Sequence, residues 1–131
     1  MIKKLILLSV FIAFVSCNSS SEIKKIDSEN LIVLENSKDI QVVDVRRLEE
    51  YNSGHITGAV NIDFYKSTFV DDINKLDKSK TIVVYCKSGN RSYKSALIMD
   101  SLGFTDIYDF SEGMNGWISG SNEVIVLDSL Y

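Results

Sequence analysis

The chain has little of what a metal site or a nucleic-acid surface requires. Its 131 residues include one histidine and two cysteines, too few for the four nitrogen or sulfur ligands of a structural zinc site. Acidic residues outnumber lysine and arginine by 18 to 14, whereas nucleic-acid binding needs a clustered basic surface. There is no internal repeat or low-complexity tract. We therefore expect one compact domain with no metal, no cofactor and no nucleic-acid partner.

The sequence also lacks an apolar run long enough to cross a bilayer comfortably. The run LILLSVFIAFV, residues 5–15, follows two lysines and is bounded by Ser16 and Cys17. A run of this length is typical of the hydrophobic core of a signal peptide. We predict a signal peptide over residues 1–16. A buried N-terminal helix or a short membrane anchor is the alternative.

Cys17 directly follows this hydrophobic core, which resembles the lipobox of bacterial lipoproteins, although FVSC lacks the usual leucine three places before the cysteine. The resemblance implies that Cys17 becomes a lipidated N-terminus, and several acyl chains together anchor a protein stably. Residues 17–26 would then form a polar, flexible tether, and residues 27–131 the domain. We expect a monomer in the cell envelope, attached to the membrane by its lipid on the periplasmic or extracytoplasmic face.

Lipidation of Cys17 would leave Cys86 without a partner in the chain. An unpaired cysteine in an exported protein indicates a reactive thiol or pairing with another molecule. The alternative is a Cys17–Cys86 disulfide in an unlipidated protein, which would have to join a flexible terminus to the domain.

Short apolar strands alternate with helical stretches through the rest of the chain. Runs rich in β-branched residues predict strands at residues 40–45, 58–62, 81–86 and 106–110. Amphipathic or N-capped stretches predict helices at residues 26–36, 48–54, 68–76 and 90–102. In the first of these the run LIVL (31–34) also suits a strand, but Asp27 or Ser28 followed by Glu29 resembles a helix start and favours a short helix. We expect a glycine-rich turn over 111–117 and an edge strand over 123–131. This alternation predicts an α/β fold, a central parallel sheet with helices on both faces.

Cys86 ends the predicted strand 81–86, and ligands of parallel sheets bind at the carboxyl ends of strands. A tight turn from this strand into a helix near Asn90 would direct backbone N–H groups around an anion. Gly89 supplies the backbone freedom for that turn, and the helix dipole adds positive potential. Lys87 and Arg91 add formal charge, and Arg91 can hold an oxyanion with two parallel hydrogen bonds.

These features predict a lowered pKa for Cys86 and make its thiolate the expected nucleophile. We predict that the loop after Cys86 binds the substrate through Lys87, Ser88, Gly89, Asn90 and Arg91. The alternative is that Cys86 is a small buried hydrophobic residue at the end of a strand.

Five motifs occur in order along residues 27–117: VVDVR (42–46), EEYNSGHITGAVNI (49–62), CKSGNRS (86–92), LGF (102–104) and EGMNGW (112–117). Together they resemble the rhodanese family of single-domain sulfurtransferases and imply a rhodanese-like fold. Thr57 stands where that family usually has proline, and Glu112 replaces the first of a usual glycine pair.

The resemblance implies a persulfide mechanism. Cys86 would take the outer sulfur of a small anionic donor such as thiosulfate, and a thiol or cyanide acceptor would then remove it. The loop amides would stabilise the terminal sulfur anion, Arg91 would hold the donor and Lys87 would be a second contact.

Four further residues in the matching segments have structural interpretations. We expect Asp44 and Arg46 to form a structural ion pair, His55 to stabilise a turn by hydrogen bonding, and Trp117 to lie in the core.

Two other functions remain open. Related cysteine loops in phosphatases and arsenate reductases also bind tetrahedral oxyanions, but rhodanese-like phosphatases have five residues between cysteine and arginine. Here four residues separate Cys86 from Arg91, which favours sulfur transfer. The second alternative is a persulfide carrier or redox module that does not turn over thiosulfate.

Overall fold

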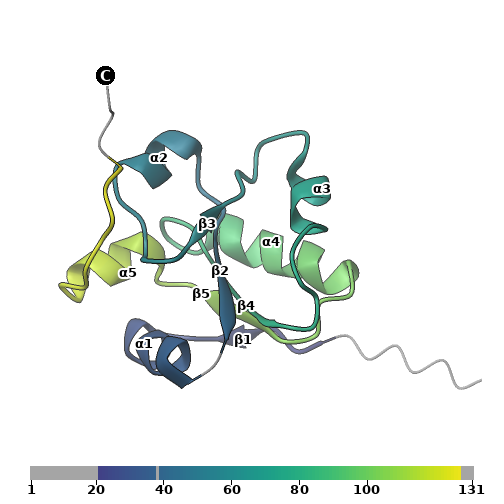
Figure 1. The fold of residues 1–131 in the computed structure, drawn as a ribbon, viewed down its shortest axis with the longest axis horizontal. Coiled ribbons are helices and arrows are strands. Elements are labelled where there is room, and N and C mark those ends of the chain that lie inside the picture. The colour runs from purple at the N-terminus through teal and green to yellow at the C-terminus, as the bar shows by residue number, and fades with distance from the viewer. Residues whose placement is uncertain (1–20, 38, 128–131) are drawn as a thin grey trace, which may run out of the picture.

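The computed structural model describes residues 21–37 and 39–127 (Figure 1). Within them a parallel sheet has the strand order β1-β5-β4-β2-β3. Its strands are β1 (Lys24–Lys25), β2 (Ile40–Asp44), β3 (Val60–Asn61), β4 (Thr81–Tyr85) and β5 (Ile107–Phe110). The helices are α1 (Ser28–Ser37), α2 (Leu48–Asn52), α3 (Phe69–Ile73), α4 (Asn90–Ser101) and α5 (Gly113–Ser119). The predicted α/β architecture is confirmed.

Strand β4 lies in the middle of the sheet because its sequence, TIVVY, can be buried on both faces. All five of its residues are buried, and β-branched side chains suit such a position. In the register of the sheet Tyr85 pairs with Asp44 of β2 and with Phe110 of β5. The carboxyl ends of β2, β4 and β5 therefore lie side by side, and Cys86 follows directly.

Helices cover both faces of the sheet (Figure 1). Helices α3 and α4 pack on one face through residues such as Ile73 and Met99, in the same apolar cluster as Cys86. Helices α1 and α5 pack on the other face through residues such as Leu31 and Trp117. Trp117 is 5% exposed, and its indole N–H donates to the Glu123 carbonyl at 2.7 Å. The predicted core position of Trp117 is confirmed.

The segment predicted as a glycine-rich turn, residues 111–117, is instead largely helical, because α5 begins at Gly113. Its first amides have acceptors outside the helix: Met114 N–H donates to the Cys86 carbonyl at 2.9 Å and Asn115 N–H to the Lys87 carbonyl at 3.1 Å. These tertiary contacts satisfy the N–H groups that a helix start leaves free. The prediction of a turn was wrong because glycine content alone does not reveal such partners.

The predicted edge strand over residues 123–131 is also wrong for the part that the structure describes. There Ile125 forms an isolated antiparallel bridge with His55, with backbone N–O distances of 2.9 and 2.8 Å. The bridge attaches the segment around Ile125 to the loop that follows α2. It adds no strand to the parallel sheet.

The predicted flexible tether over residues 17–26 differs from the structure in its second half. Strand β1 pairs with Tyr108 and Asp109 of β5, and Ile26 is 8% exposed in the core. Backbone pairing at a sheet edge needs no apolar side chains, so a polar sequence concealed this strand. The folded part thus begins before residue 27. The predicted signal peptide and Cys17 lie outside the described residues.

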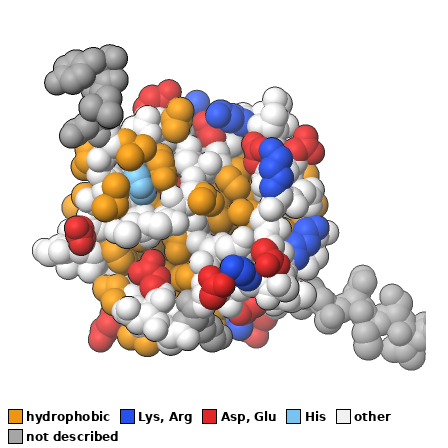
Figure 2. All heavy atoms as spheres, in the orientation of Figure 1, with side chains coloured by type: hydrophobic (Ala, Val, Ile, Leu, Met, Phe, Trp, Pro, Cys, Tyr) orange, Lys and Arg blue, Asp and Glu red, His pale blue; other side chains and the backbone are white. Residues whose placement is uncertain are grey.

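The surface of the described residues carries both signs of charge. On the face in Figure 2, lysine and arginine side chains lie beside aspartate and glutamate side chains. Among the described residues, no helix combines the length and apolar character needed to cross a membrane.

Candidate active site

Cys86 lies immediately after β4 at the carboxyl edge of the sheet, and it is the free cysteine among the described residues. It is 1% exposed. The chain turns from Cys86 into α4 so tightly that the Gly89 amide donates to the Cys86 sulfur at 3.2 Å. The sulfur therefore lies at the floor of the loop formed by residues 86–92.

Two opposing effects act on the pKa of Cys86. Burial raises it, because the thiolate loses water. Hydrogen bonds from the amide and hydroxyl of Ser92 and from the amides of Ser88 and Gly89 lower it, and together they prevail. The pKa of Cys86 is consequently lower than that of an ordinary thiol, as predicted. The main lowering contributions come from amides and a hydroxyl, whereas the sequence had also suggested the side chains of Lys87 and Arg91.

Two glycines in left-handed conformations fix the shape of the loop. Gly89 has φ +100°, and a Cβ there would lie 2.6 Å from the Ser111 carbonyl oxygen. Gly113 has φ +59°, and a Cβ there would lie 2.4 Å from the Cys86 carbonyl oxygen. Neither position has room for a side chain. Glu112, at φ −68°, has ordinary backbone geometry, so its departure from the family pattern leaves the position that needs glycine intact.

The Arg91 side chain is paired with another side chain and is not free to bind an anion. Its guanidinium makes two hydrogen bonds to the carboxylate of Glu50, at 2.7 and 3.0 Å, and lies 5.9 Å from the ring centre of Tyr65. The pair, with Arg91 as the first cause, lowers the pKa of Glu50 to about 2, and Glu50 raises the pKa of Arg91. The Cys86 thiolate also raises the pKa of Arg91, so the guanidinium lies within electrostatic range of the thiol.

The remaining predicted binding residues are exposed or partly exposed. Ser88, Gly89 and Asn90 line a cavity of about 520 Å³ between the loop, the start of α4 and the β1–β5 edge. Lys87 is exposed and is not among the residues that line this cavity. Among the described residues no group of three or more histidine, cysteine or acidic side chains is placed to hold a metal ion.

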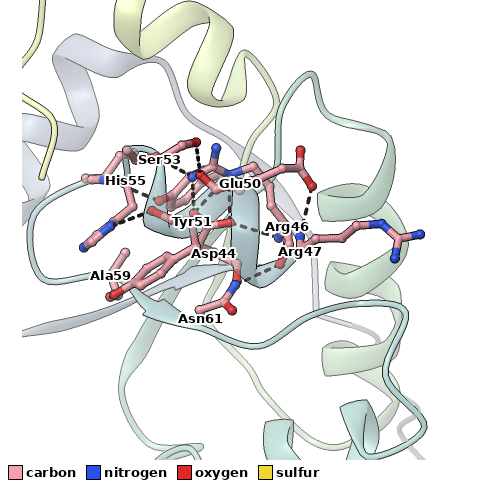
Figure 3. Close-up of polar contacts among 12 residues, drawn as sticks. Asp44, Arg46, Arg47, Glu50, Tyr51, Ser53, His55, Ala59 and Asn61 are labelled. Carbon is pink, nitrogen blue, oxygen red and sulfur yellow. Dashed lines mark hydrogen bonds and ion pairs between the residues drawn. The ribbon is translucent and has the colours of Figure 1, made fainter. Parts of the chain in front are cut away.

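The neighbouring motif residues have the structural roles expected of them (Figure 3). Asp44 and Arg46 form a buried ion pair with a shortest N–O distance of 2.6 Å, and Arg46 also donates to the Gly54 carbonyl at 2.7 Å. His55 is 5% exposed, its Nδ1 lies 3.0 Å from the Tyr51 carbonyl, and its ring stacks on that of Tyr51. Together these contacts hold the chain between α2 and β3.

Three residues of the site were not predicted: Glu50, Ser92 and Asp109. Ser92 follows Arg91, and its place in the first turn of α4 could have been inferred from the helix start. Glu50 and Asp109 gave no local signal, because their partners lie 41 and 17 residues away in the chain. Only the fold brings these carboxylates to the loop.

This geometry, a cysteine at the end of a central parallel strand with amides turned towards its sulfur, agrees with the comparison with known protein families. The model of the rhodanese-like domain matches residues 28–119. The chain belongs to the rhodanese-like family.

Particular relatives support the assignment. The thiosulfate sulfurtransferase GlpE of Shewanella oneidensis is 30% identical over 97 residues, 74% of this chain and 94% of the relative. GlpE of Pseudomonas fluorescens is 35% identical over 97 residues, 74% and 86% of the two chains. Among solved structures, a rhodanese-like domain protein from Staphylococcus aureus has a TM-score of 0.67 with 31% identity, covering 79% of this chain and 98% of that one.

Proposed function

We propose that the protein is a sulfurtransferase that moves sulfane sulfur from a small anionic donor such as thiosulfate to a thiol or cyanide through a persulfide on Cys86. The observation that carries this proposal is the ring of amides around a buried sulfur with a lowered pKa. Family membership and the similarity to thiosulfate sulfurtransferases support it.

In the first step the Cys86 thiolate attacks the outer sulfur of thiosulfate. The sulfur–sulfur bond of the donor breaks, sulfite leaves with the bonding electrons, and a Cys86 persulfide anion remains. The loop amides that lower the pKa of Cys86 then lie close to the new terminal sulfur, where they stabilise its negative charge. In the second step a thiolate or cyanide attacks this terminal sulfur and regenerates the Cys86 thiolate.

In this proposal Arg91 binds the donor only after its guanidinium is released, at least in part, from Glu50. Its bidentate pair with Glu50 neutralises the cation that would attract a dianion. The lowered pKa of Glu50 keeps the pair ionised at neutral pH. Glu50 therefore competes with the donor for Arg91.

The decisive test combines mass spectrometry with a turnover assay. Thiosulfate should add 32 Da to Cys86 in the wild-type protein, and addition of a thiol or cyanide should remove it with release of persulfide or thiocyanate. Cys86→Ala should abolish both steps, and Arg91→Ala should mainly raise KM for thiosulfate. A +32 Da adduct without turnover would indicate a persulfide carrier, whereas hydrolysis of p-nitrophenyl phosphate that depends on Cys86 would indicate a phosphatase.

We also propose that Cys17 carries a lipid that anchors the protein in the cell envelope, with the domain in the extracytoplasmic space. The supports are the hydrophobic run over residues 5–15 and the cysteine that follows it. Metabolic labelling with a palmitate analogue should label the wild-type protein and not the variant Cys17→Ala. Equal labelling of the two proteins, or none in either, would contradict the anchor.

A further inference from the structure

Ser92 is a fully buried hydroxyl with more acceptors than it has hydrogens. It lies in the first turn of α4 and is 0% exposed. Its Oγ lies 2.7 Å from Asp109 Oδ1 and 3.2 Å from the Gly89 carbonyl oxygen, and the hydroxyl also lowers the pKa of Cys86. A serine carries one hydroxyl hydrogen. Donation to Asp109 therefore withdraws this hydrogen from the sulfur.

Asp109, which accepts a hydrogen bond from Ser92, gave no signal in the local sequence. It lies near the end of β5 and is 1% exposed. Its Oδ2 has no hydrogen-bond partner, which is true of no other buried side-chain nitrogen or oxygen in the described part of the chain. Buried polar atoms nearly always find a partner, so an exception calls for an explanation. Burial raises the pKa of Asp109, while Ser92 and Lys25 act to lower it.

Asp109 can exchange a proton with solvent. It lines the cavity of about 520 Å³ beside the loop. The charged or titratable groups that face it are Lys25, its register partner on β1, Tyr93 and Lys94 of α4, which line the same cavity, and Cys86 through Ser92. Lys25 supplies positive charge that favours ionisation of Asp109 and opposes the effect of burial.

We propose that Asp109 is a positioning residue that controls, through Ser92, whether a hydroxyl hydrogen reaches the sulfur of Cys86. An ionised Asp109 accepts the hydrogen of Ser92. A protonated Asp109 donates its own hydrogen to Ser92 Oγ, and the Ser92 hydrogen then turns to the sulfur and stabilises its anion. The inference rests on the proposed function only in treating Cys86 as the nucleophile. It concerns the acidity of the thiol, which can be measured without sulfur transfer.

The test measures the pH dependence of Cys86 alkylation by iodoacetamide in the full chain, followed on the Cys86 peptide so that Cys17 does not contribute. Asp109→Asn, whose amide can donate to Ser92, should lower the pKa of Cys86 by about half a unit or more. Ser92→Ala alone should change the pKa of Cys86 less, because an ionised Asp109 already accepts the Ser92 hydrogen at the pH where Cys86 titrates. In the double variant, Asp109→Asn should lower the pKa of Cys86 by less than half as much as it does when Ser92 is present. If Asp109→Asn lowers the pKa of Cys86 equally with and without the Ser92 hydroxyl, the charge of Asp109 acts directly on the sulfur and the proposed role of Ser92 is wrong. If Asp109→Asn leaves the pKa of Cys86 unchanged, the proposal is also overturned.

Two controls keep the outcome interpretable. Asp106→Asn changes a carboxylate at the opposite end of β5, where it contacts Lys24 and Thr81, and should leave the pKa of Cys86 unchanged. In unmodified wild-type protein, carbon-13 NMR of the Asp109 carboxyl should show a pKa that changes when Cys86 is alkylated, because coupling between sites is reciprocal. An unchanged Asp109 pKa overturns the proposal even if a variant fails to fold.

Failure of this inference differs from failure of the proposed function. A wild-type protein that shows the coupled titration but gains no 32 Da with thiosulfate would retain the relay and lose the sulfurtransferase assignment. A protein that gains 32 Da with thiosulfate but shows no coupled titration would keep the sulfurtransferase assignment, and Asp109 would then have no role at Cys86.

Discussion

At the scale of single residues, the acidity of Cys86 comes from groups that carry no formal charge. The amides of Ser88 and Gly89 and both donors of Ser92 oppose the effect of burial on its pKa. Arg91, which carries charge, is engaged with Glu50 instead. In the proposed function the site would separate two tasks: neutral donors would stabilise the sulfur anion, and Arg91 would bind the donor once it is released from Glu50.

This division predicts the effect of removing the charge on Glu50. Glu50→Gln should lower KM for thiosulfate about three- to tenfold, because a less tightly held Arg91 attracts a dianion more strongly. Steady-state kinetics at constant ionic strength measures the change. Glu49→Gln, an exposed neighbour on the same helix, is the matched control and should leave KM unaltered. An unchanged KM in the Glu50 variant would remove Arg91 from donor binding.

The unpartnered oxygen of Asp109 predicts a pH-dependent cost in stability. Because the pKa of Asp109 is raised in the folded protein, the native state binds its proton more tightly than the unfolded state does. Stability therefore falls as pH rises from the ordinary pKa of an aspartate through the raised value. Asp109→Asn should stabilise the protein by about 1 kcal/mol at pH 7.

Thermal unfolding measures this gain, which corresponds to a rise in Tm of about 4 °C. The gain should disappear near pH 3, where the wild-type carboxyl is protonated as well. Asp71→Asn, on the exposed side of α3, should change Tm little at either pH. A gain that is the same at pH 3 and pH 7 would show that ionisation of Asp109 is not its cause.

At the scale of elements, α5 holds the loop of residues 86–92 in place. Its first amides bind the carbonyls of Cys86 and Lys87, and Gly113 brings the two backbones into contact. Gly113→Ala should cost about 3 kcal/mol, from the strained φ of +59° and the loss of hydrogen bonds. The pKa of Cys86 should return towards the ordinary 8.5 of a thiol.

Gly58→Ala is the control for this prediction. Gly58 also has a positive φ, of +76°, but a Cβ there would meet nothing within 4 Å. Its substitution should cost about 1 kcal/mol and leave the alkylation rate of Cys86 unchanged. Equal losses of stability in the two variants, by urea unfolding, would show that contact with the loop does not matter at Gly113.

The sequence predicted those elements whose side chains reveal their environment. The run TIVVY could only be a buried strand, and Gly103, with φ +95°, ends α4 as its position suggests. The start of α5 and strand β1 depend on backbone hydrogen bonds to distant residues, which composition does not record. The same reason explains the site: Cys86 and its loop were evident from local spacing, whereas Glu50 and Asp109 depend on the fold.

At the scale of the whole molecule, the chain enters the sheet earlier than its polarity suggests. Ile26 is buried, β1 pairs with β5, and Ser21 contacts Asp100 and the Phe104 carbonyl. A chain beginning at residue 27 should therefore be less stable than one beginning at residue 21 by about 2–3 kcal/mol, from the burial of Ile26 alone.

Urea unfolding of the two chains measures this difference. Lys24→Ala in the longer chain is the control, because it removes an ion pair with Asp106 whose lysine side chain is 48% exposed and such pairs contribute little. Equal midpoints for chains beginning at 21 and 27 would show that the segment is a tether after all.

The near-complete burial of Cys86 has a consequence for what the protein can meet in its surroundings. A sulfur that is 1% exposed limits the access of reagents according to their size. If the protein transfers sulfur as proposed, we expect a small anion that presents a single sulfur atom to reach Cys86 more readily than a bulky electrophile does. The same burial would protect the thiol from bulky oxidants.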